Sequence, residues 1–72
     1  MIYINTEYIT LTQLLKITNF INSGGEAKMA VKNLNIYLNG VKENRRNKKI
    51  YVGDVVIIED NKFIIKNEDS KS

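Results

Sequence analysis

Apolar residues recur at helical spacing in two stretches of the chain. The first stripe consists of Leu11, Leu14, Leu15 and Thr18, with Lys16 on the outer side. The second consists of Ala27, Ala30, Val31 and Leu34. Residues three or four apart lie on one face of a helix, so each stripe predicts a short amphipathic helix. Phe20 and Ile21 stand between the two stripes and are expected to fill the core there.

Each predicted helix begins at a capping box. Thr10 is followed three residues later by Gln13, and Ser23 by Glu26. In this motif the hydroxyl accepts the amide three residues on, and the longer side chain accepts the amide of the capping residue. The boxes therefore predict where both helices start, and the second helix is expected over residues 24–33.

The predicted helices end at asparagines, where glycine is common. Either Asn19 or Asn22 is expected to take the left-handed turn after the first helix. The second helix ends near Asn33-Leu34-Asn35, and we expect an asparagine there to supply any positive φ angle.

Shorter runs with strand character occupy the rest of the chain, at residues 2–4, 36–38, 50–52, 55–58 and 63–65. Asn39-Gly40 is a strong hairpin signal, and Gly53-Asp54 and Asp60-Asn61-Lys62 predict two further turns. Together these patterns predict an α+β fold, in which two short helices pack on a small antiparallel β-sheet with residues 2–4 at its edge. We expect one domain at residues 1–66 and a polar C-terminal tail at residues 67–72.

The composition argues against catalysis. The 72 residues include neither cysteine nor histidine, which excludes disulfides and thiol chemistry and removes the commonest general base. The sequence contains no glycine-rich phosphate loop, nucleophile elbow or metal-binding motif. Asp54 and Glu59 are interpreted as turn or edge residues. We therefore expect no enzyme, no catalytic residues, no metal, no cofactor and no small-molecule substrate.

The first residues contain no basic segment followed by a long apolar run, so we expect neither a signal peptide nor a membrane span. A cytoplasmic protein is the default expectation.

Positive charge is concentrated in the middle of the chain. The net charge is +3, but residues 16–49 carry eight of the eleven cations and only two acids, so this stretch is +6 and the remainder −3. Five of these cations lie in residues 42–49, where like charges repel unless an anion compensates them. The distribution favours one surface that binds a polyanion.

Several residues of this middle stretch are candidates for binding. Arg45 and Arg46 are the two arginines of the chain, and a planar guanidinium can hold a phosphate with two prongs. Lys48 and Lys49 are expected to add to the positive electrostatic field without specific contacts. Lys28 and Lys32, one helical turn apart, fit either RNA contacts or an ordinary exposed face.

Two other groups have a structural alternative. Gly24-Gly25 would allow a phosphate to approach a helix N-terminus, but they also suit capping, and the neighbouring Glu26 argues against an anion there. Tyr37 and Tyr51 lie near the cations, where they would stack on unpaired bases, although packing across the sheet is the favoured interpretation.

The order of these motifs resembles the S-four RNA-binding domain, whose fold is often called the αL motif. The matching pieces are Leu14-Leu15-Lys16, Ser23-Gly24-Gly25-Glu26-Ala27-Lys28, Leu38-Asn39-Gly40, Asn44-Arg45-Arg46 and Val52-Gly53-Asp54-Val55-Val56. The Ser-Gly-Gly-x-Ala-Lys form is similar to the stand-alone YaaA-type branch. The resemblance implies RNA binding through the two helices and the adjoining loop, by Lys16, Lys28, Lys32, Arg45, Arg46, Lys48 and Lys49.

From this we expect a monomeric protein that binds structured RNA, ribosomal RNA in particular, in ribosome assembly or association. Shape and phosphate contacts would dominate, because the deep groove of double-helical RNA hides the bases. The alternatives are a protein-interaction module that docks on an acidic partner and a binder of double-stranded DNA. Against the latter, the pattern predicts no long recognition helix.

Overall fold

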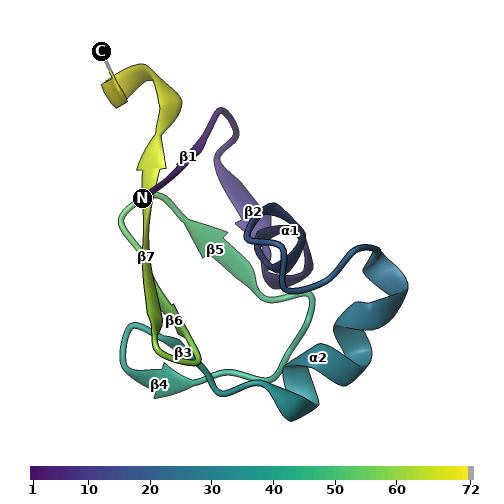
Figure 1. Ribbon diagram of the computed structural model, residues 1–72. Helices are drawn as coiled ribbons and strands as arrows, with labels where there is room; N and C mark the ends of the chain where they lie inside the picture. The colour runs from purple at the N-terminus through teal and green to yellow at the C-terminus, as the bar shows by residue number, and fades with distance from the viewer. Residues whose placement is uncertain (72) are drawn as a thin grey trace.

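The computed structural model describes residues 1–71 (Figure 1). Its helices are α1 (Leu11–Ile17) and α2 (Ala27–Asn33), with single 3₁₀ turns at η1 (Gly24–Glu26) and η2 (Glu68–Lys71). Its strands are β1 (Ile2–Ile4), β2 (Tyr8–Thr10), β3 (Ile36–Leu38), β4 (Val41–Lys42), β5 (Lys49–Tyr51), β6 (Val55–Ile58) and β7 (Asn61–Asn67). The α+β class and the two helices of the sequence analysis are confirmed.

The strands form two sheets. Five of them make a sheet in the order β1-β7-β6-β3-β4, while β2 and β5 pair separately in a two-stranded antiparallel ribbon. β1 lies at the edge, as expected, but it runs parallel to β7 with Ile2 opposite Ile65. The expected antiparallel sheet is therefore mixed. No short turn joins the first strand to the last, so local turn signals do not determine their relative direction.

Both capping boxes form, and the helical stripes face inward. Gln13 Oε1 accepts the Thr10 amide at 2.8 Å, and Glu26 Oε2 accepts the Ser23 amide at 2.9 Å. Asn19 takes the left-handed turn after α1, at φ 65°. At the second exit no residue takes a positive φ angle. The cap residue Leu34 is extended, so the chain leaves α2 directly towards β3 and needs no left-handed residue.

The core lies between the helices and the five-stranded sheet, on one side of which α1 and α2 lie in Figure 1. Its fully buried large side chains come from α1 and from the strands: Leu11, Leu14, Leu15, Ile36, Ile50, Val56, Ile58 and Ile65. Ile21 is buried, and Phe20 packs against this cluster from its edge. Burial of such side chains contributes about 1.5–3 kcal/mol each, which is what allows so short a chain to fold around one core.

The predicted hairpin forms at Asn39-Gly40, and its turn is tied to another part of the chain. Asn39 and Gly40 have φ of 50° and 85°, which carries the strands back with Leu38 opposite Val41. The Asn39 side chain accepts the Val55 amide at 2.9 Å and donates to Asp54 Oδ1 at 3.1 Å. We call this contact the hairpin corner; its residues are Asn39, Gly40, Asp54 and Val55.

The last hairpin differs slightly from the expectation. β7 begins at Asn61, directly after Glu59, which has φ 56°, and Asp60, so the turn lies one or two residues earlier than predicted. β7 continues to Asn67, opposite Ile4, and η2 follows it. Ordered pairing thus extends one residue past the expected domain boundary, and Ser72 lies outside the described residues. No helix among residues 1–71 is long and apolar enough to cross a membrane.

Candidate nucleic-acid interface

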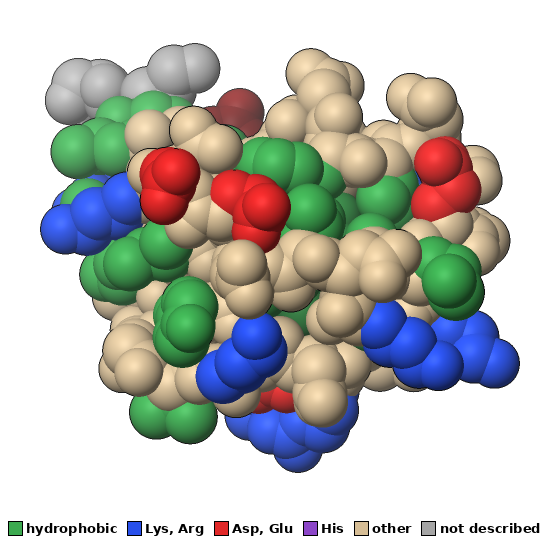
Figure 2. Space-filling view, turned by 60° about the horizontal axis from the view of Figure 1, so that its bottom comes forward, with side chains coloured by type: hydrophobic (Ala, Val, Ile, Leu, Met, Phe, Trp, Pro, Cys, Tyr) green, Lys and Arg blue, Asp and Glu red, His purple; other side chains and the backbone are tan. Residues whose placement is uncertain are grey.

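A groove between α2 and the segment that follows the hairpin gathers five cations. Besides Val31, Asn44 and Asn47, its lining consists of Lys28, Lys32, Lys42, Arg45 and Arg46. We call it the basic groove. Figure 2 shows most of the visible Lys and Arg side chains along the lower part of one face, with another at the left edge; the visible acidic side chains lie mostly higher, apart from one partly covered at the bottom. Two separate elements thus direct positive charge at a common space.

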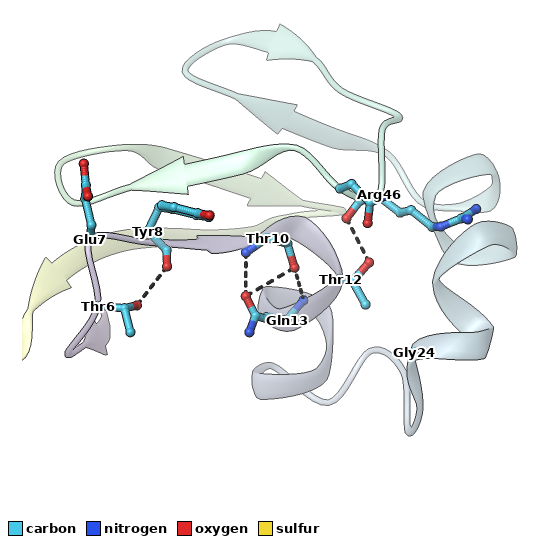
Figure 3. A pocket seen from close by; sticks show the side chains of 9 residues that line it. Thr6, Glu7, Tyr8, Thr10, Thr12, Gln13, Gly24 and Arg46 are labelled. Atoms are coloured by element: carbon cyan, nitrogen blue, oxygen red, sulfur yellow. Dashed lines mark hydrogen bonds between the residues drawn. The ribbon is translucent and has the colours of Figure 1, made fainter.

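The N-terminus of α1 holds the loop of the groove in place. The Leu11 amide donates to the Lys48 carbonyl at 2.9 Å. The amide and the hydroxyl of Thr12 both donate to the Arg46 carbonyl, at 2.9 and 2.8 Å (Figure 3). The first amides of a helix have no partner within the helix, so they are available to bind a loop. Here that capacity is used inside the protein and positions the backbone of Arg46.

Arg45 is held by a carboxylate from its own loop. Its Nε lies 2.8 Å from Glu43 Oε2, its second terminal nitrogen lies 3.1 Å from Oε1, and its backbone amide also donates to Oε2 at 3.1 Å. Glu43 is only 8% exposed, whereas the Arg45 side chain is 67% exposed. A buried carboxylate requires such pairing. In the sequence Glu43 is one of only two acids in residues 16–49, and nothing in the pattern predicts this two-pronged pair.

The pair shifts the acidity of both groups. The hydrogen bond from the Arg45 side chain lowers the pKa of Glu43; burial opposes this, while the Arg45 amide and the charges of Arg45 and Lys48 add to the lowering. In return, the Glu43 carboxylate raises the pKa of Arg45. Glu43 is therefore an internal anion that compensates part of the repulsion in residues 42–49.

Arg46 differs from its neighbour because its guanidinium makes no ion pair within the described part of the chain. It lines the basic groove together with Lys28 and Lys32. It also borders a second hollow, beside the start of α1, whose other lining residues include Tyr8, Thr12 and Asn47. In Figure 3 the Arg46 side chain extends away from that hollow towards α2. Of the two predicted arginines, Arg46 is the one with its donors available.

The other predicted lysines separate into two places. Lys48 and Lys49 line a third hollow with Arg45, Asn47 and Tyr51, which we call the ribbon hollow because it borders the β2–β5 ribbon. Lys16 lies exposed in the last turn of α1 and lines none of these three hollows. The structure thus brings six of the seven predicted cations around one loop and leaves Lys16 apart.

Lys42 belongs to the groove although the candidate residues of the sequence analysis did not include it. It stands opposite Tyr37 in the β3–β4 pairing, with its ammonium 5.8 Å from the centre of that ring and 3.2 Å from Asn35 Oδ1. The Asn39-Gly40 hairpin places these residues opposite each other, so this register was the signal that could have found it.

Glu26 carries the negative charge at the Gly24-Gly25 turn. Its Oε2 accepts the amides of Asn22 and Ser23, at 2.8 and 2.9 Å. A carboxylate therefore lies next to this turn and disfavours an anion there, and the capping interpretation of these glycines is supported. No cluster of three or more acidic residues within residues 1–71 could hold a metal ion.

Comparison with known proteins gives this architecture a family. The chain matches the S4 domain over residues 2–66. It is 50% identical over 58 residues to a protein of Bacillus subtilis (strain 168) called probable ribosome maturation protein RlbA, a match that covers 81% of this chain and 82% of the relative. The resemblance drawn from the motifs is confirmed, and the chain belongs to the S4 domain family.

Proposed function

We propose that the protein binds structured RNA through the basic groove, that this RNA is ribosomal, and that binding serves ribosome maturation. Membership of the S4 domain family and the name of the Bacillus subtilis relative support the proposal. The observation that carries it is the convergence of Lys28 and Lys32 from α2 with Lys42, Arg45 and Arg46 on one groove. The proposal includes no catalysis, a monomeric state and a cytoplasmic location.

The form of the groove favours RNA over DNA. α2 has seven residues, which corresponds to about 10 Å of helix, and no helix among the described residues has the length of the continuous basic helices that cross a major groove. Cations on two elements suit contacts to phosphates and sugars, which dominate the recognition of A-form RNA. An acidic protein partner would use the same charges, and ribonuclease treatment separates the two cases.

The test compares two variants with the same change in net charge. Lys28→Glu reverses a charge in the basic groove, and Lys62→Glu reverses an exposed charge on β7, outside the groove. Glutamate is tolerated in the first turn of a helix, so Lys28→Glu is expected to stay folded. Tagged proteins would be sedimented from native extracts on sucrose gradients, with and without ribonuclease, and folding would be checked by circular dichroism.

We expect wild type and Lys62→Glu to travel with ribosomal particles and Lys28→Glu to remain near the top. Ribonuclease should bring all three to the top. Equal sedimentation of the two variants would reject the groove as the binding site. Association that survives complete ribonuclease digestion would instead support the acidic protein partner.

A further inference from the structure

The outer face of the β2–β5 ribbon carries aromatic side chains that are not part of the hydrophobic core. Ile9 and Ile50 point inward and are buried, whereas Tyr8 and Tyr51, the cross-strand neighbours on the other face, are 36% and 42% exposed. Their ring centres are 5.5 Å apart and the rings are tilted by 48°. Lys49, on the same face, places its ammonium 5.0 Å from the centre of the Tyr8 ring. Such a pair stabilises a ribbon, but it also leaves ring surface open to solvent.

This aromatic pair is connected to the basic groove. Arg45 and Asn47 line both the basic groove and the ribbon hollow, and Tyr51 lines the ribbon hollow with them. Asn47 also lines the hollow beside α1, where Tyr8 is found, so all three hollows meet at this residue. A polyanion that leaves the basic groove past Asn47 would therefore meet Lys48, Lys49 and the exposed ring of Tyr51.

We propose that Tyr51 is a stacking platform for an unpaired base of the bound RNA, with Lys48 and Lys49 contacting the adjoining phosphates. The inference rests on the proposed function and adds to it a class of RNA: a helical segment flanked by a single-stranded one. Stacking on an aromatic ring is tolerant of base identity, because every base has a flat face.

Tyr8 acts through Tyr51 and is a positioning residue. The ring of Tyr8 is in contact with Tyr51 on one side and with Lys49 on another. Packing against Tyr8 limits the rotamers of Tyr51 before RNA arrives, so little side-chain freedom remains to be lost on binding. Tyr51 is the better platform because it, and not Tyr8, lines the hollow that also includes Arg45, Lys48 and Lys49.

The test uses two RNA probes that differ in one feature. The first is a fully paired RNA hairpin, and the second is the same hairpin with a short single-stranded extension that contains 2-aminopurine, made in a 5′ and a 3′ form. Stacking quenches 2-aminopurine fluorescence, so affinity and stacking are read in the same titration. The variants are Tyr51→Leu, which removes the ring, and Tyr51→Phe, which keeps it. Tyr3→Leu, on edge strand β1 and outside the three hollows, is the control.

We expect wild type to prefer one extended hairpin over the paired hairpin by about tenfold, with quenching. Tyr51→Phe and Tyr3→Leu should keep both effects. Tyr51→Leu should reduce the preference to near unity and abolish quenching, while its affinity for the paired hairpin changes little. A Tyr51→Leu variant that retains preference and quenching would overturn the inference.

Two further outcomes separate this inference from the proposed function. If Tyr51→Leu disturbs the ribbon, its affinity for the paired hairpin also falls, and the variant no longer tests stacking by itself. In that case stacking is tested on the wild-type protein by NMR. The ring protons of Tyr51 should shift in NMR spectra on addition of the extended hairpin and not of the paired one, and equal shifts with both probes reject stacking.

If wild type binds neither hairpin, both proposals fall. If it binds the paired hairpin and Lys28→Glu does not, the function stands whatever happens at Tyr51.

Discussion

The loop at residues 42–49 lies in the chain between the two halves of the hairpin corner, but the two regions use their polar side chains differently. At the corner, the Asn39 side chain is bonded to Val55 and Asp54, and Asp54 Oδ2 accepts the Tyr51 amide at 2.8 Å. In the loop, the side chains of Arg46 and Lys48 have no ion-pair partner within the described residues. The polar groups of the corner bond to one another and to the neighbouring backbone, whereas most polar side chains of the loop are exposed to solvent.

This difference shows that a motif shared with a family can stabilise the fold without providing side chains for ligand binding. Two of the matched pieces, Leu38-Asn39-Gly40 and Val52-Gly53-Asp54-Val55-Val56, meet at the corner and join two hairpins. Another matched piece, Asn44-Arg45-Arg46, lies in the loop. It contains one arginine bound within the protein and one that is not, because Arg45 is bound to Glu43 whereas Arg46 is not. The comparison can be tested by substitutions that affect stability in one region and RNA binding in the other.

The largest effect is expected at the corner. Asn39→Ala removes two hydrogen bonds and places alanine at φ 50°, so the free energy of unfolding should fall by about 2–3 kcal/mol. Asn44→Ala, an exposed loop position, is the matched control and should change it by less than about 0.5 kcal/mol. Urea unfolding measures both. Equal losses would mean that the corner contributes no more than the loop.

A smaller effect is expected on binding at Arg46. Arg46→Ala should weaken the binding of structured RNA about five- to tenfold, because one charged contact to a phosphate is lost. The slope of log affinity against log salt should become shallower by about 0.7–0.9, since one fewer counterion is released. Urea unfolding should be unchanged. A variant that loses stability but not affinity would assign Arg46 to the architecture.

Arg45 is expected to behave differently from Arg46. Arg45→Ala leaves the buried Glu43 carboxylate without its side-chain partner, so the pKa of Glu43 should rise and the midpoint of urea unfolding should fall. NMR titration of the Glu43 side chain and urea unfolding of both arginine variants measure the contrast. If Arg45→Ala unfolds at the wild-type midpoint while RNA affinity drops, the pair with Glu43 contributes nothing and Arg45 is simply another binding residue.

The smallest effect concerns pH. Because the folded protein holds the pKa of Glu43 below its ordinary value of 4.5, the pair contributes fully above about pH 4.5 and is lost as pH falls through the lowered pKa. Unfolding free energies of wild type and Glu43→Gln should therefore converge as the pH falls through the lowered pKa of Glu43. A difference between the two proteins that stays constant with pH would show that Glu43 does not titrate with folding.

Local signals predicted much of this molecule. The capping boxes at Thr10 and Ser23 and the Asn39-Gly40 turn act over three residues or fewer, and each forms as expected. Of the cations in residues 45–49, Arg45 and Arg46 line the groove beside α2, whereas Lys48 and Lys49 line the ribbon hollow. The order of motifs was sufficient to recognise the family, because five short pieces in sequence are far more specific than any one of them.

The features that local signals missed are pairings between distant residues. β2 and its ribbon with β5 were not foreseen, since a three-residue strand such as Tyr8–Thr10 has little pattern of its own. The parallel direction of β1 was missed for the same reason. Glu43 pairs with Arg45 only two residues away, and what was missed there is the packing that buries the carboxylate. Each depends on which surface the rest of the chain supplies at that place.

The sequence alone thus determined the helices, the main hairpin and the concentration of positive charge, because helix caps, turn residues and charge are properties of neighbours in the chain. Only the tertiary structure decided that Arg45 is bound to Glu43 while Arg46 is available, and that Lys42 joins the groove. It also placed Tyr51 beside Lys48 and Lys49 in the lining of the ribbon hollow. The availability of a side chain depends on the partners that folding brings within hydrogen-bond distance, and these partners are set by packing of the whole chain.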